Sequence, residues 1–287
     1  MSNSSSCEHA RAEKSVLKIG VFQMDIVHKD PEANRLKVSD ILKRLSGLPD
    51  TPDTLDILVL PETWTTGFSR SVFSDISDLA EGEDGPSVAL LKEIAASAGC
   101  YIIGGSILEK DGGRYYNTSF VISPEHRIIG KYRKIQLFTP FDEDKTLTHG
   151  TELPVFDLPF ATVGIMTCYD LRFPEICRSY ALQGAKIVFV PSNFPKPRLD
   201  VWVTLSKARA LENELFVVAV NRTGDTPEAA YFGHSLVITP RGGVIVDAGE
   251  EETFFTTTID LTEVERFRQE IPVLKDRRSD VFMAHGR

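Results

Sequence analysis

The stretch "GIMTCYDLRFPE" (residues 164–175) joins two kinds of chain at a single cysteine. The residues "TVGIMT" (162–167) are mostly apolar or β-branched and predict a buried strand. The residues from Pro174 onward predict a helix, because proline at the first helical position loses no helical hydrogen bond. Cys168 is therefore either a small core residue or a thiol displayed at a strand-to-helix turn.

Strand-like and helical segments alternate around this stretch along nearly the whole chain. Strands are predicted over residues 16–26, 56–62, 100–108, 115–123, 127–135, 186–193 and 215–223. Helices are predicted over residues 31–45, 86–99 and 200–214. The mixture of βα units and hairpins predicts a single α/β domain over residues 16–285, preceded by a loose polar tail over residues 1–15.

Composition limits the partners of this chain. It has 287 residues, of which 42% are hydrophobic, and a formal net charge of -9. A chain of this size buries a large core, and its acidic balance argues against a nucleic-acid or anionic-membrane partner. No apolar run reaches the roughly 18 to 20 residues of a membrane span. The polar start lacks the apolar core of a signal peptide, so a soluble cytoplasmic protein is expected.

The four cysteines (Cys7, Cys100, Cys168 and Cys177) form neither a dense disulfide framework nor a set of metal ligands. No CxxC or HxxxH spacing occurs, and the six histidines are scattered. We therefore expect no metal and no cofactor. Cys100 and Cys177 lie in apolar patterns and are interpreted as core residues.

Three predicted strands end on, or run into, a polar residue that bears on chemistry. Glu62 closes "DILVLPE", Lys134 lies in "KYRKIQLF", and Cys168 closes "TVGIMTC". Taken singly, each has an ordinary structural explanation. Together they match the needs of a thiol nucleophile, which requires a base, a cation for developing charge, and backbone donors for an oxyanion. Spacing alone does not bring the three residues together.

Three segments, in order, resemble the signatures of the nitrilase (carbon–nitrogen hydrolase) superfamily. They are "LVLPETWTTGF" (58–68), "YRKIQLF" (132–138) and "GIMTCYDLRFPE" (164–175). Later segments such as "VFVPSNFP" and "ARALENE" continue the family's pattern, and the resemblance runs from about Lys18 to Phe282.

This resemblance implies a four-layer α-β-β-α sandwich of the nitrilase type with a Glu-Lys-Cys triad. Matched residue by residue, Glu62 is the expected general base and Cys168 the expected nucleophile. Lys134 is expected to stabilise the tetrahedral intermediate, together with the backbone N–H of Tyr169.

Many members of the family carry a second glutamate after the lysine. In "FTPFDEDKTLTHG" the match places it at Glu143, with Asp142 and Asp144 as neighbouring alternatives. The chain departs from related amidases at Gln136, where they often have histidine, and at Val201, where close relatives have histidine before the tryptophan.

Cys168-Tyr169-Asp170 resembles the amidase branches of the family rather than the nitrilases proper. The expected function is a thiol amidase that hydrolyses a small carboxylate-bearing ω-amide, such as 2-oxoglutaramate, to the acid and ammonia through a cysteinyl thioester. Amidohydrolysis of deaminated glutathione or of N-carbamoyl amino acids is an alternative within the family. A non-catalytic binding member, the glutaminase subunit of a larger synthetase, and a redox sensor that pairs Cys168 with Cys177 are alternatives of other classes.

The loop "PSNFPKPRLDVW" (191–202) is expected to form one wall of the substrate pocket. Arg198 suits bidentate binding of a carboxylate, and Phe194 and Trp202 are expected to line the apolar stretch beside it.

Arg198 has a structural alternative, a surface ion pair with Asp200 or Glu212. Arg172 competes with Arg198 for the carboxylate, although the family resemblance favours a structural ion pair for Arg172.

A homodimer or higher homo-oligomer is also expected, because the family pairs its sandwiches through the helices that follow the cysteine. Here these helices cover residues 174–183 and 200–214. Their candidate interface residues are Ile176, Tyr180, Leu205 and Leu211. The alternative is that these apolar faces pack only within one subunit.

Overall fold

The computed structural model describes residues 14–41 and 55–281. The predicted tail over residues 1–15 lies outside these ranges except for its last two residues.

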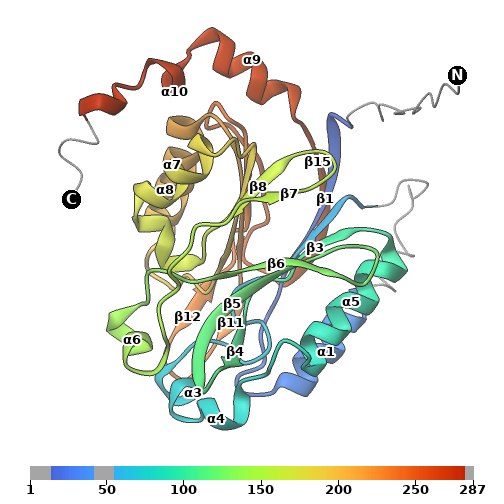
Figure 1. Ribbon diagram of the computed structural model, residues 1–287. Helices are drawn as coiled ribbons and strands as arrows, with labels where there is room; N and C mark the ends of the chain where they lie inside the picture. The colour runs from blue at the N-terminus through green and yellow to red at the C-terminus, as the bar shows by residue number, and fades with distance from the viewer. Residues whose placement is uncertain (1–13, 42–54, 282–287) are drawn as a thin grey trace, which may run out of the picture.

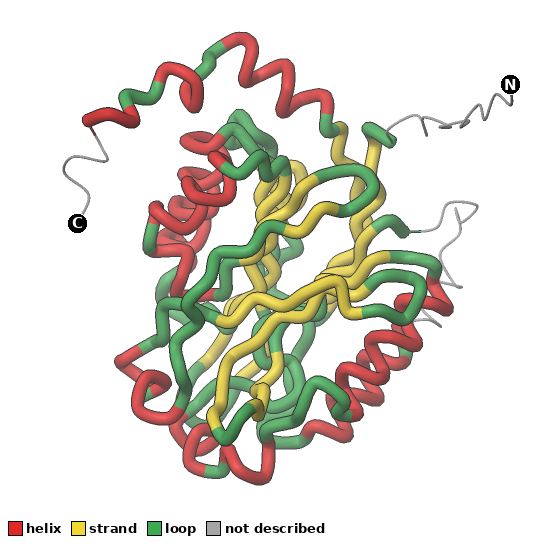
Figure 2. The backbone as a smooth tube through the Cα atoms, in the orientation of Figure 1, coloured by secondary structure: helices red, strands yellow, loops and turns green. Residues whose placement is uncertain are grey.

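The strands of the described chain form two main sheets that face one another (Figure 2). The first has the order β15-β1-β2-β3-β5-β4, with β6 paired to β5. Its strands are β1 (Val16–Gln23), β2 (Ile57–Val59), β3 (Tyr101–Ile103), β4 (Ile107–Asp111), β5 (Arg114–Ile122), β6 (Ile128–Arg133) and β15 (Thr253–Asp260).

The second sheet has the order β14-β13-β10-β9-β8-β7. Its strands are β7 (Phe156–Asp157), β8 (Thr162–Ile165), β9 (Ile187–Ser192), β10 (Phe216–Asn221), β13 (Leu236–Ile238) and β14 (Val244–Asp247). A short separate ribbon consists of β11 (Thr223–Asp225) and β12 (Ala230–Phe232).

Helices cover the outer face of each sheet (Figure 1). The first sheet is covered by α1 (Pro31–Ser39) and α5 (Pro86–Ala98), and the second by α7 (Pro174–Leu182) and α8 (Leu199–Asn213). Short helices gather at one end of the molecule: α3 (Arg70–Ser74), α4 (Ile76–Leu79), η1 (Thr139–Phe141) and α6 (Glu143–Thr146). At the other end, α9 (Thr262–Glu270) and α10 (Val273–Asp276) lead to the C-terminus.

Three apolar clusters separate these layers, and the alternation of side chains along the strands assigns each residue to one of them. In β10, Phe216, Val218 and Val220 point between the two sheets, whereas Val217 and Ala219 pack under the helices α7 and α8. Successive strand residues point to opposite faces, so a strand that is buried on both sides reads as a continuous apolar run. The layer order is α-β-β-α, as the resemblance to the nitrilase superfamily implied.

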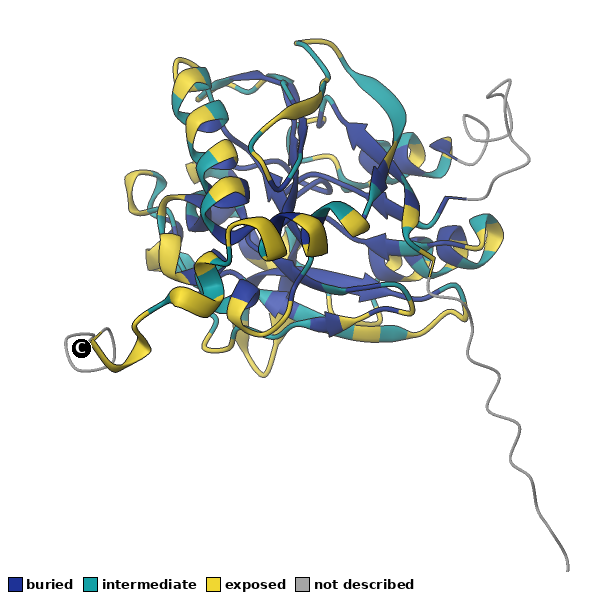
Figure 3. Cartoon of the chain, turned by 90° about the horizontal axis from the view of Figure 1, so that it is seen from above, coloured by how far each residue is buried: buried dark blue, intermediate teal, exposed yellow. Residues whose placement is uncertain are grey.

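Burial follows the same layers. Seen from above, most strands in the middle of the molecule are buried, and the helices on its outside carry both exposed and buried residues (Figure 3). Within the described chain, no helix is both long and apolar enough to cross a bilayer.

The first and last strands of the described chain lie side by side in the first sheet. The strand β15 pairs antiparallel with β1 along its whole length, from Val16 opposite Asp260 to Gln23 opposite Thr253. The other edge of β1 pairs in parallel with β2. The first sheet therefore depends on the last strand of the chain.

The predicted hairpin is confirmed as β5 and β6, whereas the strand predicted over residues 100–108 is two strands. Gly104 and Gly105 interrupt it between β3 and β4. Gly105 has φ +60°, and a Cβ atom there would lie 2.0 Å from the carbonyl oxygen of Pro61. Only glycine permits this approach, which fastens the turn against the segment that carries Glu62.

Candidate active site

The three polar strand ends that the sequence predicted come from both sheets. Glu62 follows β2 and Lys134 follows β6 in the first sheet, whereas Cys168 follows β8 in the second. The side chains of Glu62 and Lys134 are fully buried, and Cys168 is partly exposed.

Lys134 lies between two buried carboxylates. Its Nζ is 2.8 Å from Oε1 of Glu62 and 2.9 Å from Oε2 of Glu143. Burial alone would lower the pKa of Lys134, but the charges of Glu143 and Glu62 outweigh it and raise this pKa. The lysine is therefore held as a cation.

The structure separates the three neighbouring acids of the lysine loop. Glu143 is fully buried, and Oε2 of its carboxylate also accepts the backbone N–H of Phe138 at 2.6 Å. Asp142 instead pairs with Arg70 and Lys145 at the surface, and Asp144 is exposed. Burial raises the pKa of Glu143, although Lys134 partly offsets this effect. Of the three acids, only Glu143 contacts Lys134.

Two buried asparagines that the sequence analysis did not single out hold the carboxylates. Nδ2 of Asn117 donates to Oε1 of Glu62 at 2.9 Å and to Oε1 of Glu143 at 3.0 Å. The backbone N–H of Asn193 donates to Oε2 of Glu62 at 2.8 Å. The signal in the sequence was a polar residue inside, or directly after, an apolar strand.

Cys168 occupies the strained turn that follows β8. It opens the 3₁₀ helix η2 (Cys168–Arg172) with φ +46°, a conformation that L-residues other than glycine rarely adopt. Such strain persists at functional sites where the surrounding structure imposes it. The Glu62 carboxylate and the Asn193 N–H both act on the pKa of the thiol, which places the two groups beside it.

Burial raises the pKa of the Cys168 thiol, and the charge of Glu62 raises it further. The charge of Lys134 and the N–H of Asn193 oppose this shift only in part. The resting residue is therefore a neutral thiol, and it needs a base at the moment of attack.

A buried aspartate joins the cysteine turn to the lysine loop. Oδ2 of Asp170 accepts the Tyr132 hydroxyl at 2.7 Å and the Thr167 N–H at 2.8 Å, and its Oδ1 accepts the Gln136 N–H at 2.8 Å. Burial raises the pKa of Asp170 to about 6 in spite of these donors. This network fixes the two segments relative to one another.

The backbone N–H of Tyr169 is available for an oxyanion. Among the described residues, it donates to no backbone or side-chain acceptor. The Tyr169 ring packs edge-on against Phe138 and Phe173, with centroid distances of 5.1 and 5.3 Å. These contacts hold the residue that follows Cys168 in a fixed orientation.

The predicted substrate-binding residues differ in how far they are buried. Phe194 and Trp202 are buried with their ring centroids 5.3 Å apart, and the Trp202 indole donates to the carbonyl of His234 at 2.7 Å. Both pack in the cluster under α7 and α8. Their role in lining the substrate stays a prediction.

Arg198 is exposed at the start of α8, and Arg172 is exposed beside the Phe194 ring, with Cζ 5.7 Å from its centroid. Within the described ranges, neither arginine makes an ion pair, and Glu212 pairs with Arg209 instead. The structural ion pairs considered for the two arginines are therefore not present. Both guanidinium groups are available to a ligand.

The other two cysteines of the described chain pack in the core. Cys100 and Cys177 are buried, and burial raises the pKa of each thiol to about 12. Such thiols are unreactive, which agrees with their interpretation as core residues. Among the described residues, no group of three or more His, Cys, Asp and Glu side chains is arranged to hold a metal ion.

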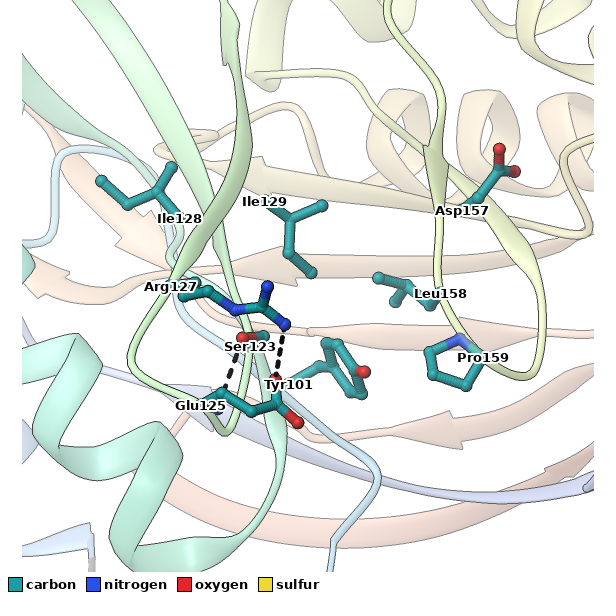
Figure 4. A pocket seen from close by; sticks show the side chains of 9 residues that line it. All are labelled: Tyr101, Ser123, Glu125, Arg127, Ile128, Ile129, Asp157, Leu158 and Pro159. Carbon is teal, nitrogen blue, oxygen red and sulfur yellow. Dashed lines mark hydrogen bonds and ion pairs between the residues drawn. The ribbon is translucent and has the colours of Figure 1, made fainter.

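A hollow away from this cluster lies between the hairpin of β5 and β6 and the turn that joins β7 to β8 (Figure 4). Its lining includes Tyr101, Arg127 and Leu158, but none of the residues around Lys134. We therefore place the candidate site at the carboxylate cluster and not in this hollow.

The arrangement around Cys168 contains what acyl transfer requires. A neutral thiol lies beside a carboxylate, a buried cation adjoins that carboxylate, and an unused backbone N–H follows the thiol. The family model described as carbon-nitrogen hydrolase matches residues 18–269. The chain belongs to the carbon-nitrogen hydrolase family. The predicted superfamily is thereby confirmed.

Several curated relatives of this carbon-nitrogen hydrolase are amidases by name. It is 38% identical over 265 residues to the 2-oxoglutaramate amidase of Bacillus subtilis, an alignment that covers 92% of this chain and 98% of the relative. It is 36% identical over 236 residues to the human omega-amidase NIT2, covering 79% and 84% of the two chains. The prediction of an enzyme that hydrolyses amides is confirmed.

Solved structures agree with the fold of this carbon-nitrogen hydrolase. Nit3 of Saccharomyces cerevisiae, a member of branch 10 of the nitrilase superfamily, has a TM-score of 0.84 and 29% identity. The match covers 94% of this chain and 99% of the yeast protein. The four-layer sandwich is therefore the nitrilase fold.

Proposed function

We propose that this enzyme hydrolyses a short ω-amide with a carboxylate at its far end, such as 2-oxoglutaramate, to the acid and ammonia. The observation that carries the proposal is the buried Glu62–Lys134–Glu143 cluster beside the thiol of Cys168. The names of the relatives, a 2-oxoglutaramate amidase and an omega-amidase, support the substrate.

In the first half of the proposed reaction, Glu62 takes the thiol proton as the sulfur of Cys168 attacks the amide carbonyl carbon. A C–S bond forms, and the carbonyl oxygen becomes an oxyanion near the Lys134 ammonium and the Tyr169 N–H. The C–N bond then breaks, and ammonia leaves with the proton that Glu62 returns. The product is a thioester on Cys168.

In the second half, water replaces ammonia. Glu62 takes a proton from the water as the water oxygen attacks the thioester carbon. The C–S bond then breaks to release the acid, and Glu62 returns the proton to the sulfur of Cys168, which restores the free thiol. Glu143 keeps Lys134 charged and in place through both halves, because its carboxylate contacts the same ammonium.

A carboxylate-binding arginine is the part of this proposal that determines substrate specificity. Arg198 is our prediction, and the exposed Arg172 four residues after Cys168 is the competing candidate. A guanidinium fork matches a carboxylate with two parallel hydrogen bonds, so either residue is suited to the far end of the substrate.

We expect 2-oxoglutaramate to be hydrolysed far better than a neutral aliphatic amide of equal length. Arg198→Met is expected to raise KM for the acid roughly ten- to a hundredfold, since a hydrogen bond to a charged group contributes about 1.5 to 3 kcal/mol. The neutral amide is expected to be almost unaffected. Released ammonia, measured over a range of concentrations of each substrate, gives KM for the acid and for the neutral amide.

Arg172→Met is the matched variant for this experiment. If it raises KM for the acid alone while Arg198→Met does not, the carboxylate site belongs to Arg172. An equal loss on both substrates in Arg198→Met indicates that Arg198 supports its loop instead. If no ω-amide releases ammonia, the proposed substrate class is wrong.

We also propose that the enzyme is a cytoplasmic homodimer or higher oligomer. Two of the predicted interface residues, Ile176 and Tyr180, are instead buried in the subunit's own core, as the alternative held. Leu211 on α8 and Leu182 at the end of α7 stay about half exposed and support an interface there.

Sedimentation at micromolar protein is expected to give a species of at least twice 31.9 kDa. Leu211→Glu is expected to shift this species toward the monomer, because it places a charge in a surface that association would desolvate. A wild-type protein that sediments as a monomer contradicts the proposal.

A further inference from the structure

The Asn117 side chain on β5 connects the charged groups of the site. It is buried, and its Nδ2 donates to Glu62 and to Glu143 at 2.9 and 3.0 Å. Its backbone oxygen also accepts the N–H of Lys134 at 2.9 Å. We propose that Asn117 is a positioning residue that spaces the two carboxylates and makes one oxygen of Glu62 the base.

A primary amide is suited to this task because its nitrogen carries two hydrogens and no charge. Each hydrogen of Asn117 is used by one carboxylate, so the residue stabilises both anions without changing the net charge of the cluster. Lys134 supplies the only positive charge that the structure places against both carboxylates among the described residues. One cation neutralises only one of the two carboxylates, so the hydrogen bonds from Asn117 offset the remaining repulsion between Glu62 and Glu143.

The donors are distributed unevenly over the two oxygens of Glu62. Oε1 accepts from both Asn117 and Lys134, whereas among the N–H groups of the described residues Oε2 accepts that of the Asn193 backbone alone. A carboxylate oxygen offers about two acceptor sites, so Oε1 is saturated and Oε2 keeps one site open. The thiol proton of Cys168 is therefore received at Oε2.

The acceptor side of the Asn117 amide supports a role beyond ordinary packing. Its Oδ1 is buried and has no hydrogen-bond partner among the described residues. A buried polar side chain normally satisfies both ends of its amide. Here the structure uses only the donor end, which is the end that serves Glu62 and Glu143.

The test compares Asn117→Leu and Asn117→Asp with the wild-type enzyme. Asn117→Leu is expected to lower kcat roughly ten- to a hundredfold, with KM within about threefold of the wild-type value. Loss of a donor raises the pKa of a carboxylate, so the acid limb of the kcat profile is expected to move to higher pH. Asn117→Asp preserves the shape but adds a third carboxylate, and is expected to lower kcat at neutral pH at least as much.

Thr118→Val is the matched control. Thr118 is the next residue on the same strand, is equally buried, and donates to the carboxylate of Glu109 at 2.7 Å on the other face. Its loss is expected to lower the melting temperature about as much as Asn117→Leu. The kcat value and the pH profile are expected to stay those of the wild type.

The inference rests on the proposed role of Glu62 as base, so a second readout uses no substrate. The rate at which iodoacetamide alkylates Cys168 is measured against pH in the same variants, with Cys100 and Cys177 buried as internal references. We expect the acid limb of this profile to move upward in Asn117→Leu only.

Profiles of Asn117→Leu that coincide with those of Thr118→Val in both readouts overturn the inference. A wild-type enzyme that hydrolyses no amide in the panel contradicts the proposed function alone. In that case the alkylation profiles still decide on Asn117.

Discussion

Replacement of Cys168 by alanine is expected to abolish hydrolysis while the protein stays folded. The thiol is the only atom at this position that forms the proposed acyl intermediate. Alanine keeps the Cβ atom, so the strained backbone at φ +46° is neither relieved nor made worse. Ammonia release is the measurement, and the melting temperature reports the fold.

Serine at this position is also expected to be inactive. The base in the site is a carboxylate, which is much too weak to deprotonate an alcohol to a useful extent. Cys177→Ala serves as the control because this thiol is buried and hydrogen-bonds to the carbonyl of Arg209, away from the charged cluster. It is expected to keep most of the turnover, and full activity in Cys168→Ala would exclude covalent catalysis by this residue.

Glu62→Gln is expected to lower kcat by about a hundredfold or more, the usual range for loss of a general base. Both oxygens of Glu62 accept hydrogen bonds: Oε1 from Asn117 and Lys134, and Oε2 from the backbone N–H of Asn193. A glutamine amide places its own N–H₂ against one of these donors. The variant therefore loses the base and disturbs the cluster, and kcat is the parameter to measure.

Lys134→Met is expected to lose comparable activity through the transition state. It also leaves Glu62 and Glu143 buried without their shared cation, so the melting temperature is expected to fall. The double variant Glu62→Gln/Lys134→Met is expected to have a kcat only slightly lower than that of either single variant, because the two residues act as a unit. Glu270→Gln, at an exposed glutamate paired with Arg241, is the control. Unchanged turnover in Glu62→Gln would contradict the proposed role of Glu62 as the general base.

The sequence predicted the triad because each member closes, or stands near the end of, an apolar strand. It did not bring the members together, because Glu62 and Lys134 follow strands of one sheet and Cys168 follows a strand of the other. Their meeting depends on how two sheets face one another, which local periodicity does not encode. The family resemblance supplied that information.

Burial separates residues that look alike in the sequence. Asp142, Glu143 and Asp144 are three successive acids. The folded loop that follows Lys134 places only the middle one against the lysine. Asn117 reads as one polar residue inside a strand, because its partners are distant in the sequence. Trp202 reads equally well as a core residue or as a pocket wall, and the structure shows it packed in the core.

The pairing of β1 with β15 constrains how this enzyme is made. A ribosome synthesises β1 before, and β15 after, every other strand of the described chain, so the edge of β1 that β15 will cover stays unpaired until β15 has emerged. Unpaired strand edges are where nascent chains associate wrongly. The first sheet reaches its native form only after β15 has been synthesised. A ribosome-bound chain halted after α8 is therefore expected to lack the protease resistance of the released protein.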